Sequence, residues 1–288
     1  MPSVRMSDGK YTRMPTGVAD FDSIINGGLP AGSVVLLLGD VGAGQLEFSL
    51  TSAAKIGLVI DNPESSDFFL GHAARHGKLP KKISYITFSK SKDDILQDVA
   101  LSFNIDYSKS LSKHLNFKDF SEEYFIRSVV PTSWVGESRA NGLFSQPKSE
   151  DMLLEDLVSY FDENSVESMI IVDSLTDLVI NDSIAFPDLV AFLKGLQRMA
   201  KRWKGLIYLI LTDGILEKKK QQMIIDSVDG VLMFEWSKSQ HTSQRQRYMY
   251  VEKFMSVLPH LDQQRIMRFA TLITSQSGFV VIDTERVG

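Results

Sequence analysis

The stretch VVLLLGDVGAGQLEFS, residues 34–49, decides the fold. Its apolar run predicts a buried strand, the glycines after it predict a turn, and the remaining residues predict a helix. This order is the context of the phosphate-binding loop G-x-x-x-x-G-K-[S/T], whose backbone amides and helix N-terminus bind phosphate. Gly39 and Gly44 have the spacing of that motif, with Asp40 and Gly42 between them. The sequence therefore predicts the architecture of a phosphate loop.

The two positions after the loop depart from the motif. Gln45 stands where a Lys would reach the terminal phosphates, and Leu46 stands where a hydroxyl would hold Mg²⁺. Phosphoryl transfer depends on positioning and on neutralising developing charge, so a loop without both groups is expected to lose most of its catalysis. Two interpretations remain open from these residues alone: a nucleotide site without its chemistry, and a glycine turn that only lets strand and helix pack closely.

Composition limits the class of protein. The chain has 288 residues, of which 43% are hydrophobic and 23% charged, as expected for one large or two small soluble α/β domains. A net charge of -5 argues against a protein that coats nucleic acid. Cysteine is absent, which excludes disulfides and thiolate chemistry, and the five histidines lack metal-ligand spacing, so we expect no metal site. No apolar run reaches the roughly 18 residues of a spanning helix, which predicts a cytoplasmic protein without membrane contact.

The region around the loop carries a family resemblance. Residues 16–44 contain a T-G-x-x-x-x-D segment and a G-G-x-P-x-G-S turn ahead of the loop glycines. This arrangement resembles the opening of the KaiC-like branch of the RecA superfamily of ATPases. The resemblance implies a RecA-like P-loop NTPase fold, in which a mostly parallel central sheet is flanked by helices and extended by antiparallel C-terminal strands. It also implies an archaeal origin.

The expected organisation follows from this fold. Residues 1–15 are expected to be a flexible N-terminal segment, and residues 16–288 to form a single RecA/KaiC-like domain. The Pro-, Gly- and Ser-rich residues 131–149 are expected to form a long loop. Such a loop is either a partner-binding surface or an ordinary excursion of the chain.

The resemblance also implies catalytic carboxylates beyond the loop. In the family, a strand followed by F-E-E-S carries glutamates that activate the attacking water. We expect a helix over 45–55 and a strand over 57–61, so the following residues place Pro63 and Glu64 at the two glutamate positions. Glu64 is then either a remaining general base or a partner of the next helix dipole.

Two further family features lie in the second half of the chain. The strand SMIIVD ends in Asp173 and resembles a Walker B strand, although such an Asp also caps neighbouring loops through amide hydrogen bonds. A returning hairpin strand in the family carries a K-x-R pair that reaches the neighbouring subunit's phosphates. Its counterparts here are Lys253, a predicted subunit-interface contact, and Met255, a further departure.

Two basic segments are candidate nucleic-acid contacts. Lys218, Lys219 and Lys220 are expected in a loop, and Arg245 and Arg247 near a hairpin tip. The alternative interpretation is that these charges simply face solvent. Their functional role would show as salt-dependent RNA or DNA binding that is lost when they are neutralised.

The sequence and the resemblance together predict a catalytically inactive, KaiC-like pseudo-ATPase. It would act as a regulatory or scaffolding protein, in homo- or hetero-oligomers with RecA/KaiC-like subunits. No cofactor is expected beyond weak binding of ATP or ADP by the loop amides. The alternatives are a non-hydrolysing nucleotide sensor, a nucleic-acid-handling ring subunit similar to recombinase paralogues or Elongator accessory subunits, and an active ATPase that uses another lysine such as Lys55.

Overall fold

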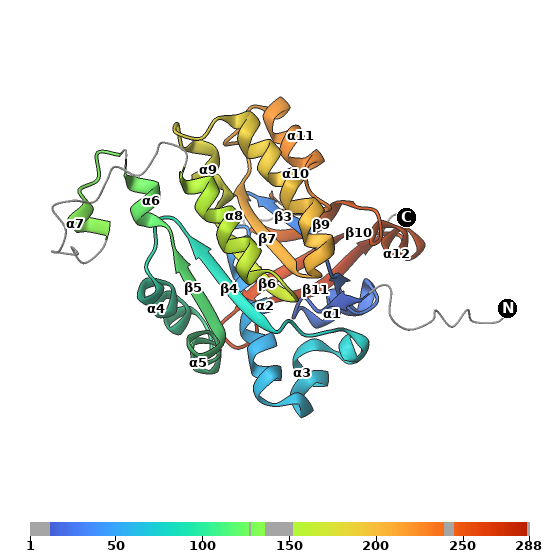
Figure 1. The fold of residues 1–288 in the computed structure, drawn as a ribbon. Helices are drawn as coiled ribbons and strands as arrows, with labels where there is room; N and C mark the ends of the chain where they lie inside the picture. Colours follow the sequence, from blue (N-terminus) through green and yellow to red (C-terminus); the bar gives the residue numbers. More distant parts are fainter. Residues whose placement is uncertain (1–11, 127, 136–151, 239–244, 287–288) are drawn as a thin grey trace.

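The computed structural model describes residues 12–126, 128–135, 152–238 and 245–286. The described chain forms a nine-stranded sheet and a two-stranded sheet (Figure 1). From one edge to the other, the large sheet runs through β11 (Gly278–Arg286), β10 (Ile266–Thr274), β9 (Arg245–Phe254), β8 (Gly230–Lys238), β3 (Ser33–Gly39), β7 (Leu206–Thr212), β6 (Ser168–Asp173), β4 (Lys82–Thr87) and β5 (Leu115–Asp119).

Neighbouring strands from β8 to β5 are parallel, whereas β8, β9, β10 and β11 follow one another antiparallel. This arrangement confirms the predicted fold class. Because the carboxyl ends of parallel strands share one edge of the sheet, the loop after β3 and the end of β6 lie on the same side of the molecule.

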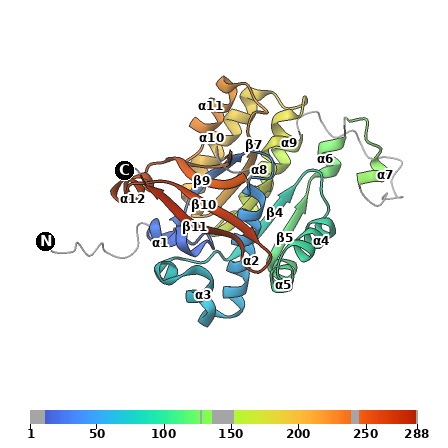
Figure 2. The ribbon, with the colours of Figure 1, turned by 180° about the vertical axis from the view of Figure 1, so that it is seen from behind.

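Helices cover both faces of the sheet. One face carries α8 (Met152–Asn164), α9 (Leu175–Ile180), α10 (Phe186–Trp203) and α11 (Lys218–Asp226). The other, seen from behind in Figure 2, carries α1 (Ala19–Ile24), α2 (Gln45–Asp61), α4 (Lys92–Ser102) and α5 (Ile105–His114). The shorter elements are η1 (Pro63–Ser65), α3 (Ser66–Leu70), η2 (His72–His76), α6 (Ser121–Phe125), α7 (Thr132–Val135) and α12 (Leu258–Gln263).

Strand β3 is buried over its whole length because each face contributes to a different core. Val35 and Leu37 belong to the cluster under α2, whereas Val34, Leu36 and Leu38 belong to the cluster under α10. Such two-sided burial explains why this strand is a continuous apolar run without alternation. In the described chain, no helix is long and apolar enough to cross a membrane.

The predicted strand over 57–61 is wrong, because α2 continues without a break to Asp61. Ile56 and Val59 are three residues apart on the helix and both are buried in the core. Gly57 lies against α5, where an added Cβ would come within 2.3 Å of the Ser110 Oγ. Packing of the two helices thus overrides the β-propensity of this segment.

Three other expectations need correction. Within the predicted flexible segment, Arg13–Met14 forms β1 and pairs with β2 (Leu29–Pro30), while residues 1–11 lie outside the described chain. Within the predicted long loop, Thr132–Val135 forms α7, and residues 136–149 are outside the described ranges. The three lysines at 218–220 lie in the first turn of α11 rather than in a loop.

The T-G-x-x-x-x-D segment folds around a buried carboxylate. Asp22 is fully buried and accepts hydrogen bonds from the Thr16 amide, the Thr16 hydroxyl and the Gly17 amide. Burial raises the pKa of Asp22 to about 7 and lowers the pKa of neighbouring Lys55 to about 8. Lys55 is ten residues along α2 from Gln45, about 15 Å at 1.5 Å per residue. Its position in the interior removes support from the hypothesis that Lys55 serves the phosphate loop.

The raised pKa of Asp22 predicts a pH-dependent free energy of unfolding. Because protonated Asp22 is favoured in the folded state, its contribution is fully present below the unfolded pKa near 4 and is lost as pH rises through about 7. We expect wild-type stability to fall by about 4 kcal/mol over this window relative to Asp22→Asn. Urea unfolding at several pH values measures this difference. Parallel pH profiles for the two proteins would contradict it.

Candidate functional site

The candidate site begins at the glycine loop between β3 and α2. Gly42 and Gly44 have φ angles of 74° and 121°, which favour glycine. Gly39 faces β8 so closely that an added Cβ would lie 2.3 Å from the Phe234 carbonyl oxygen. Strand, turn and helix therefore follow one another as predicted, with glycines where the backbone requires them.

The two departing residues turn away from the space in front of the loop. The Gln45 Nε2 donates to the Asp40 carbonyl at 3.1 Å, and only 6% of Gln45 is exposed. Leu46 packs against the core beneath α2. Gln45 thus stabilises the loop from inside, and Leu46 contributes apolar packing. Neither side chain offers a positive charge to a phosphate, and neither has the hydroxyl that holds Mg²⁺ in the motif.

The hairpin of β8 and β9 holds the loop from the other side. The Trp236 indole donates to the Val41 carbonyl at 3.2 Å, and the Trp236 amide donates to the Asp40 carboxylate at 3.2 Å. Arg247 Nε donates to the Gly42 carbonyl at 3.0 Å, while its guanidinium stacks 4.1 Å from the Trp236 ring. These contacts fix the loop, and they use the side chain of Arg247, which the sequence suggested as a nucleic-acid contact.

Asp173 lies at the carboxyl end of β6 and is 9% exposed. One of its oxygens, Oδ2, accepts a hydrogen bond from the Tyr85 hydroxyl at 2.5 Å and another from the Lys90 ammonium at 3.1 Å. Burial raises the pKa of Tyr85 well above its ordinary value, so Tyr85 is a neutral donor at physiological pH. Both partners of this carboxylate oxygen come from the chain itself rather than from a metal.

The structure does not support the placement of Pro63 and Glu64 at the glutamate positions. Glu64 is exposed within η1, which follows helix α2 instead of a sheet strand. The strand beside Asp173 is β4, where Thr87 pairs with Asp173. Its continuation, Phe88-Ser89-Lys90-Ser91, has the F-x-x-S frame.

Ser89 and Lys90 therefore stand where F-E-E-S carries its glutamates. The signal is present in the sequence, because the alternating and β-branched run ISYITF, residues 83–88, is typical of a strand and its last residue begins F-S-K-S. The glutamate positions are assigned to Ser89 and Lys90 rather than to Pro63 and Glu64 only because the order of strands places β4 next to β6.

Lys253 is engaged within its own chain. Its ammonium donates to the carbonyls of Ile225 and Val228 at 2.8 Å each and to that of Asp226 at 3.2 Å, all at the C-terminal end of α11. A cation at this end of a helix is favoured by the helix dipole. These bonds account for Lys253 without a second subunit, and its subunit-interface role stays a prediction. Met255, the other departing position, is 92% exposed.

The remaining basic residues lie on separate elements. Lys218, Lys219 and Lys220 begin α11, where the Lys220 ammonium lies 5.4 Å from the Phe186 ring. Arg245 begins β9, with its guanidinium 6.0 Å from the Trp236 ring. Among the described residues, no hydrogen bond, ion pair or ring contact joins the two groups, so the nucleic-acid surface stays a prediction.

The residues at the loop do not fit the Mg²⁺ that this fold implies. Leu46 has no oxygen, and the Oδ2 oxygen of Asp173 accepts hydrogen bonds from Tyr85 and Lys90. Within the described ranges, no group of three or more His, Asp or Glu side chains is placed to hold a metal ion. The carboxylate that would bind the metal is neutralised by a lysine instead.

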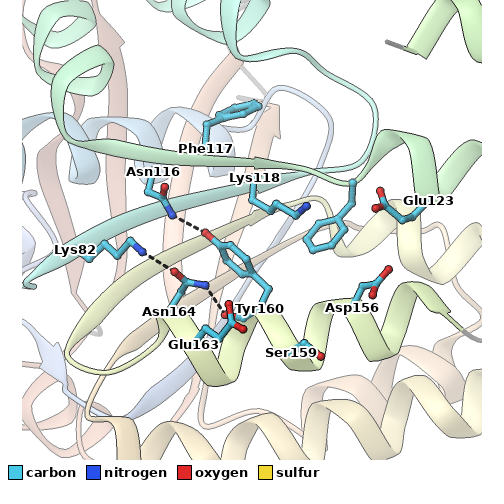
Figure 3. A pocket seen from close by; sticks show the side chains of 11 residues that line it. Lys82, Asn116, Phe117, Lys118, Glu123, Asp156, Ser159, Tyr160, Glu163 and Asn164 are labelled. Atoms are coloured by element: carbon cyan, nitrogen blue, oxygen red, sulfur yellow. Dashed lines mark hydrogen bonds between the residues drawn. The ribbon is translucent and has the colours of Figure 1, made fainter. Parts of the chain in front are cut away.

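A separate open pocket lies between β5 and α8 at the far edge of the sheet (Figure 3). Two pairs of its polar side chains bind one another: Asn116 donates to the Tyr160 hydroxyl at 2.9 Å, and Lys82 donates to Asn164. The Lys118 ammonium lies 4.4 Å from the Phe120 ring. We assign no ligand to this pocket, which is several strands away from the loop.

Comparison with known proteins places this fold among characterised relatives. No family model matches the chain. Over 104 residues it is 32% identical to the circadian clock oscillator protein KaiC of Prochlorococcus marinus (strain MIT 9313). That match covers 32% of this chain and 21% of the KaiC protein, so it spans about a fifth of the relative's length.

Two solved structures match nearly the whole chain. One is a KaiC-like protein from Pyrococcus horikoshii OT3, with a TM-score of 0.60 and 16% identity over 95% of this chain and 100% of that one. The other is the flagellar accessory protein FlaH from Methanocaldococcus jannaschii, with a TM-score of 0.60 and 17% identity over 95% and 99% of the two chains. At these identities the likeness concerns the fold.

Proposed function

For a chain that is KaiC-like in sequence and has the RecA-like fold, we propose the function of a pseudo-ATPase. It acts as a regulatory or scaffolding protein, through oligomerisation or partner binding, without efficient ATP hydrolysis. The observation that carries the proposal is the contact of Lys90 with Asp173. A hydrolytic site needs a metal beside this aspartate and a carboxylate at the position of Lys90, and the lysine provides neither.

The supporting departures act on separate parts of the reaction. Gln45 removes the charge that stabilises the terminal phosphates, and Leu46 removes a metal ligand. Ser89 and Lys90 leave no carboxylate after β4 to activate water. Each missing group raises the activation free energy of ATP hydrolysis separately, and these increases add up. No single compensating residue therefore restores the reaction.

A non-hydrolysing nucleotide sensor is the second candidate, and one observation favours it. An added Cβ at Gly42 would meet no atom within 4 Å, so the space beside this loop residue is open. Backbone amides bind phosphate independently of side chains, which keeps weak anion binding compatible with this loop. The nucleic-acid alternative has less support, because Arg247 already binds the Gly42 carbonyl.

Calorimetric titration with ATP and ADP, combined with light scattering on the same sample, tests these functions. Binding in the micromolar range supports the sensor, and a mass of several protomers supports the oligomer. No heat up to millimolar nucleotide supports a scaffold that needs no nucleotide. A monomer that binds neither nucleotide nor any RecA/KaiC-like subunit added to it would contradict the proposal.

A further inference from the structure

We propose that Lys90 is a tethered cation that excludes divalent metal from Asp173, so that phosphate-bearing ligands are bound at this site only in metal-free form. The inference rests on the pseudo-ATPase function proposed above and deepens it by specifying the form of the ligand. The ligand class is the polyphosphate group of a nucleoside di- or triphosphate.

The position of Asp173 makes its occupant relevant to the loop. In the sheet, β6 is separated from β3 only by β7, and all three strands are parallel. With neighbouring strands about 4.8 Å apart, the end of β6 lies roughly 10 Å from the end of β3. A polyphosphate that begins at the loop amides extends over a distance of this order. The charge at Asp173 therefore acts on the far end of that polyphosphate.

The contacts of Asp173 occupy Oδ2, one of its two carboxylate oxygens. Its Oδ2 accepts from both Tyr85 and Lys90, and the residue is 9% exposed. A metal at this oxygen would have to displace a short hydrogen bond and lie next to an ammonium ion. Repulsion between two cations is weakly screened at a partly buried site. The lysine thus neutralises the carboxylate and repels its usual partner.

The backbone holds Lys90 in this position. The Lys90 amide donates to the Thr87 hydroxyl at 3.2 Å, at the end of β4. The next residue, Ser91, is the N-cap of α4 and forms a capping box with Asp94. The backbone of Lys90 is therefore fixed between a strand end and a helix start, which places its side chain within reach of Asp173.

Lys90 lies among carboxylates and is also partly accessible to solvent. Asp177, on α9, interacts electrostatically with both Asp173 and Lys90. The Lys90 side chain remains 42% exposed, so part of the ammonium faces solvent beyond its bond to Asp173. The same side chain that excludes a metal can thus face an incoming anion.

Titration with Mn²⁺, followed by electron paramagnetic resonance, tests the exclusion of metal. The variants are Lys90→Gln, Asp173→Asn, the double variant, and Lys92→Gln as a matched control. Lys92 is an exposed lysine at the start of α4, so its substitution makes the same change in charge. We expect wild type, Lys92→Gln and Asp173→Asn to bind Mn²⁺ equally weakly. Lys90→Gln should bind at least about ten-fold more tightly, and Asp173→Asn should remove that gain.

Two results would overturn the proposal. One is tight Mn²⁺ binding by the wild-type protein that a folded Asp173→Asn variant loses. The other is a folded Lys90→Gln protein that binds Mn²⁺ no better than wild type. Circular dichroism on the same samples reports whether each variant is folded.

A second titration compares ATP binding in EDTA with ATP binding in excess Mg²⁺. Clearly tighter binding in EDTA supports the proposal, whereas equal binding under the two conditions, or binding that requires Mg²⁺, contradicts it. No binding under either condition contradicts the nucleotide-sensor function alone, and the Mn²⁺ titration then decides the role of Lys90. Failure of the inference and failure of the function are thus distinguishable.

Discussion

The double substitution Gln45→Lys with Leu46→Thr is expected to raise the affinity for ATP by roughly 10- to 100-fold, as charge-assisted contacts to phosphate are worth a few kcal/mol. Gln45 now bonds the Asp40 carbonyl at the start of α2. A lysine there reaches the terminal phosphates if the glycine loop is a phosphate loop. Calorimetric titration with ATP measures the gain.

The matched control is Gln45→Met with Leu46→Val, which changes the same positions without adding charge or oxygen. We expect no gain in affinity from this control. We also expect the Lys and Thr variant to stay inactive in hydrolysis, because Ser89 and Lys90 still lack a carboxylate and Lys90 still occupies Asp173. An unchanged ATP affinity in the Lys and Thr variant would mean that the loop only joins strand and helix.

Replacing Phe48 by Ala is expected to lower the free energy of unfolding by about 3–5 kcal/mol, as for other buried phenylalanines. Phe48 lies in the first turns of α2 and is completely buried. Its ring makes edge contacts with Tyr208, Phe234 and Phe279 at centroid distances of 5.8, 5.7 and 5.4 Å. The cavity left by Ala would separate α2, and with it the loop, from strands β7, β8 and β11.

Urea unfolding of Phe48→Ala measures this loss, with Phe68→Ala as the control. Phe68 is 82% exposed on α3, so its truncation should change stability by less than about 1 kcal/mol. Comparable losses in the two variants would contradict the role of Phe48 in fixing α2 to the sheet.

Sequence reasoning predicts elements well where local and tertiary signals agree. The apolar run predicts strand β3, and the glycines after it predict the turn. An apolar stripe that begins at Pro187 predicts helix α10. It fails at 57–61, where a β-prone segment continues α2 because Gly57 and Val59 fit between α5 and the core. The β-propensity of residues 57–61 contains no information about α5, the helix that packs against this segment.

The site itself depends on contacts between residues far apart in sequence. Gly42 binds Arg247, and Asp173 binds Tyr85 and Lys90. The motif positions Gln45 and Leu46 are visible in the sequence, because the loop is local. The position of Lys90 is not, because it requires knowing that β4 lies next to β6. Sheet order is a tertiary property, and it moves the expected glutamate positions from Pro63 and Glu64 to Ser89 and Lys90.

The most direct test of the account measures phosphate release from ATP by the purified wild-type protein with excess Mg²⁺, beside the Asp173→Asn variant. The account predicts equal rates for the two proteins, both at the level of buffer alone, because Asp173 holds Lys90 rather than a metal. A wild-type rate clearly above background that Asp173→Asn abolishes would contradict the central claim and identify a working ATPase.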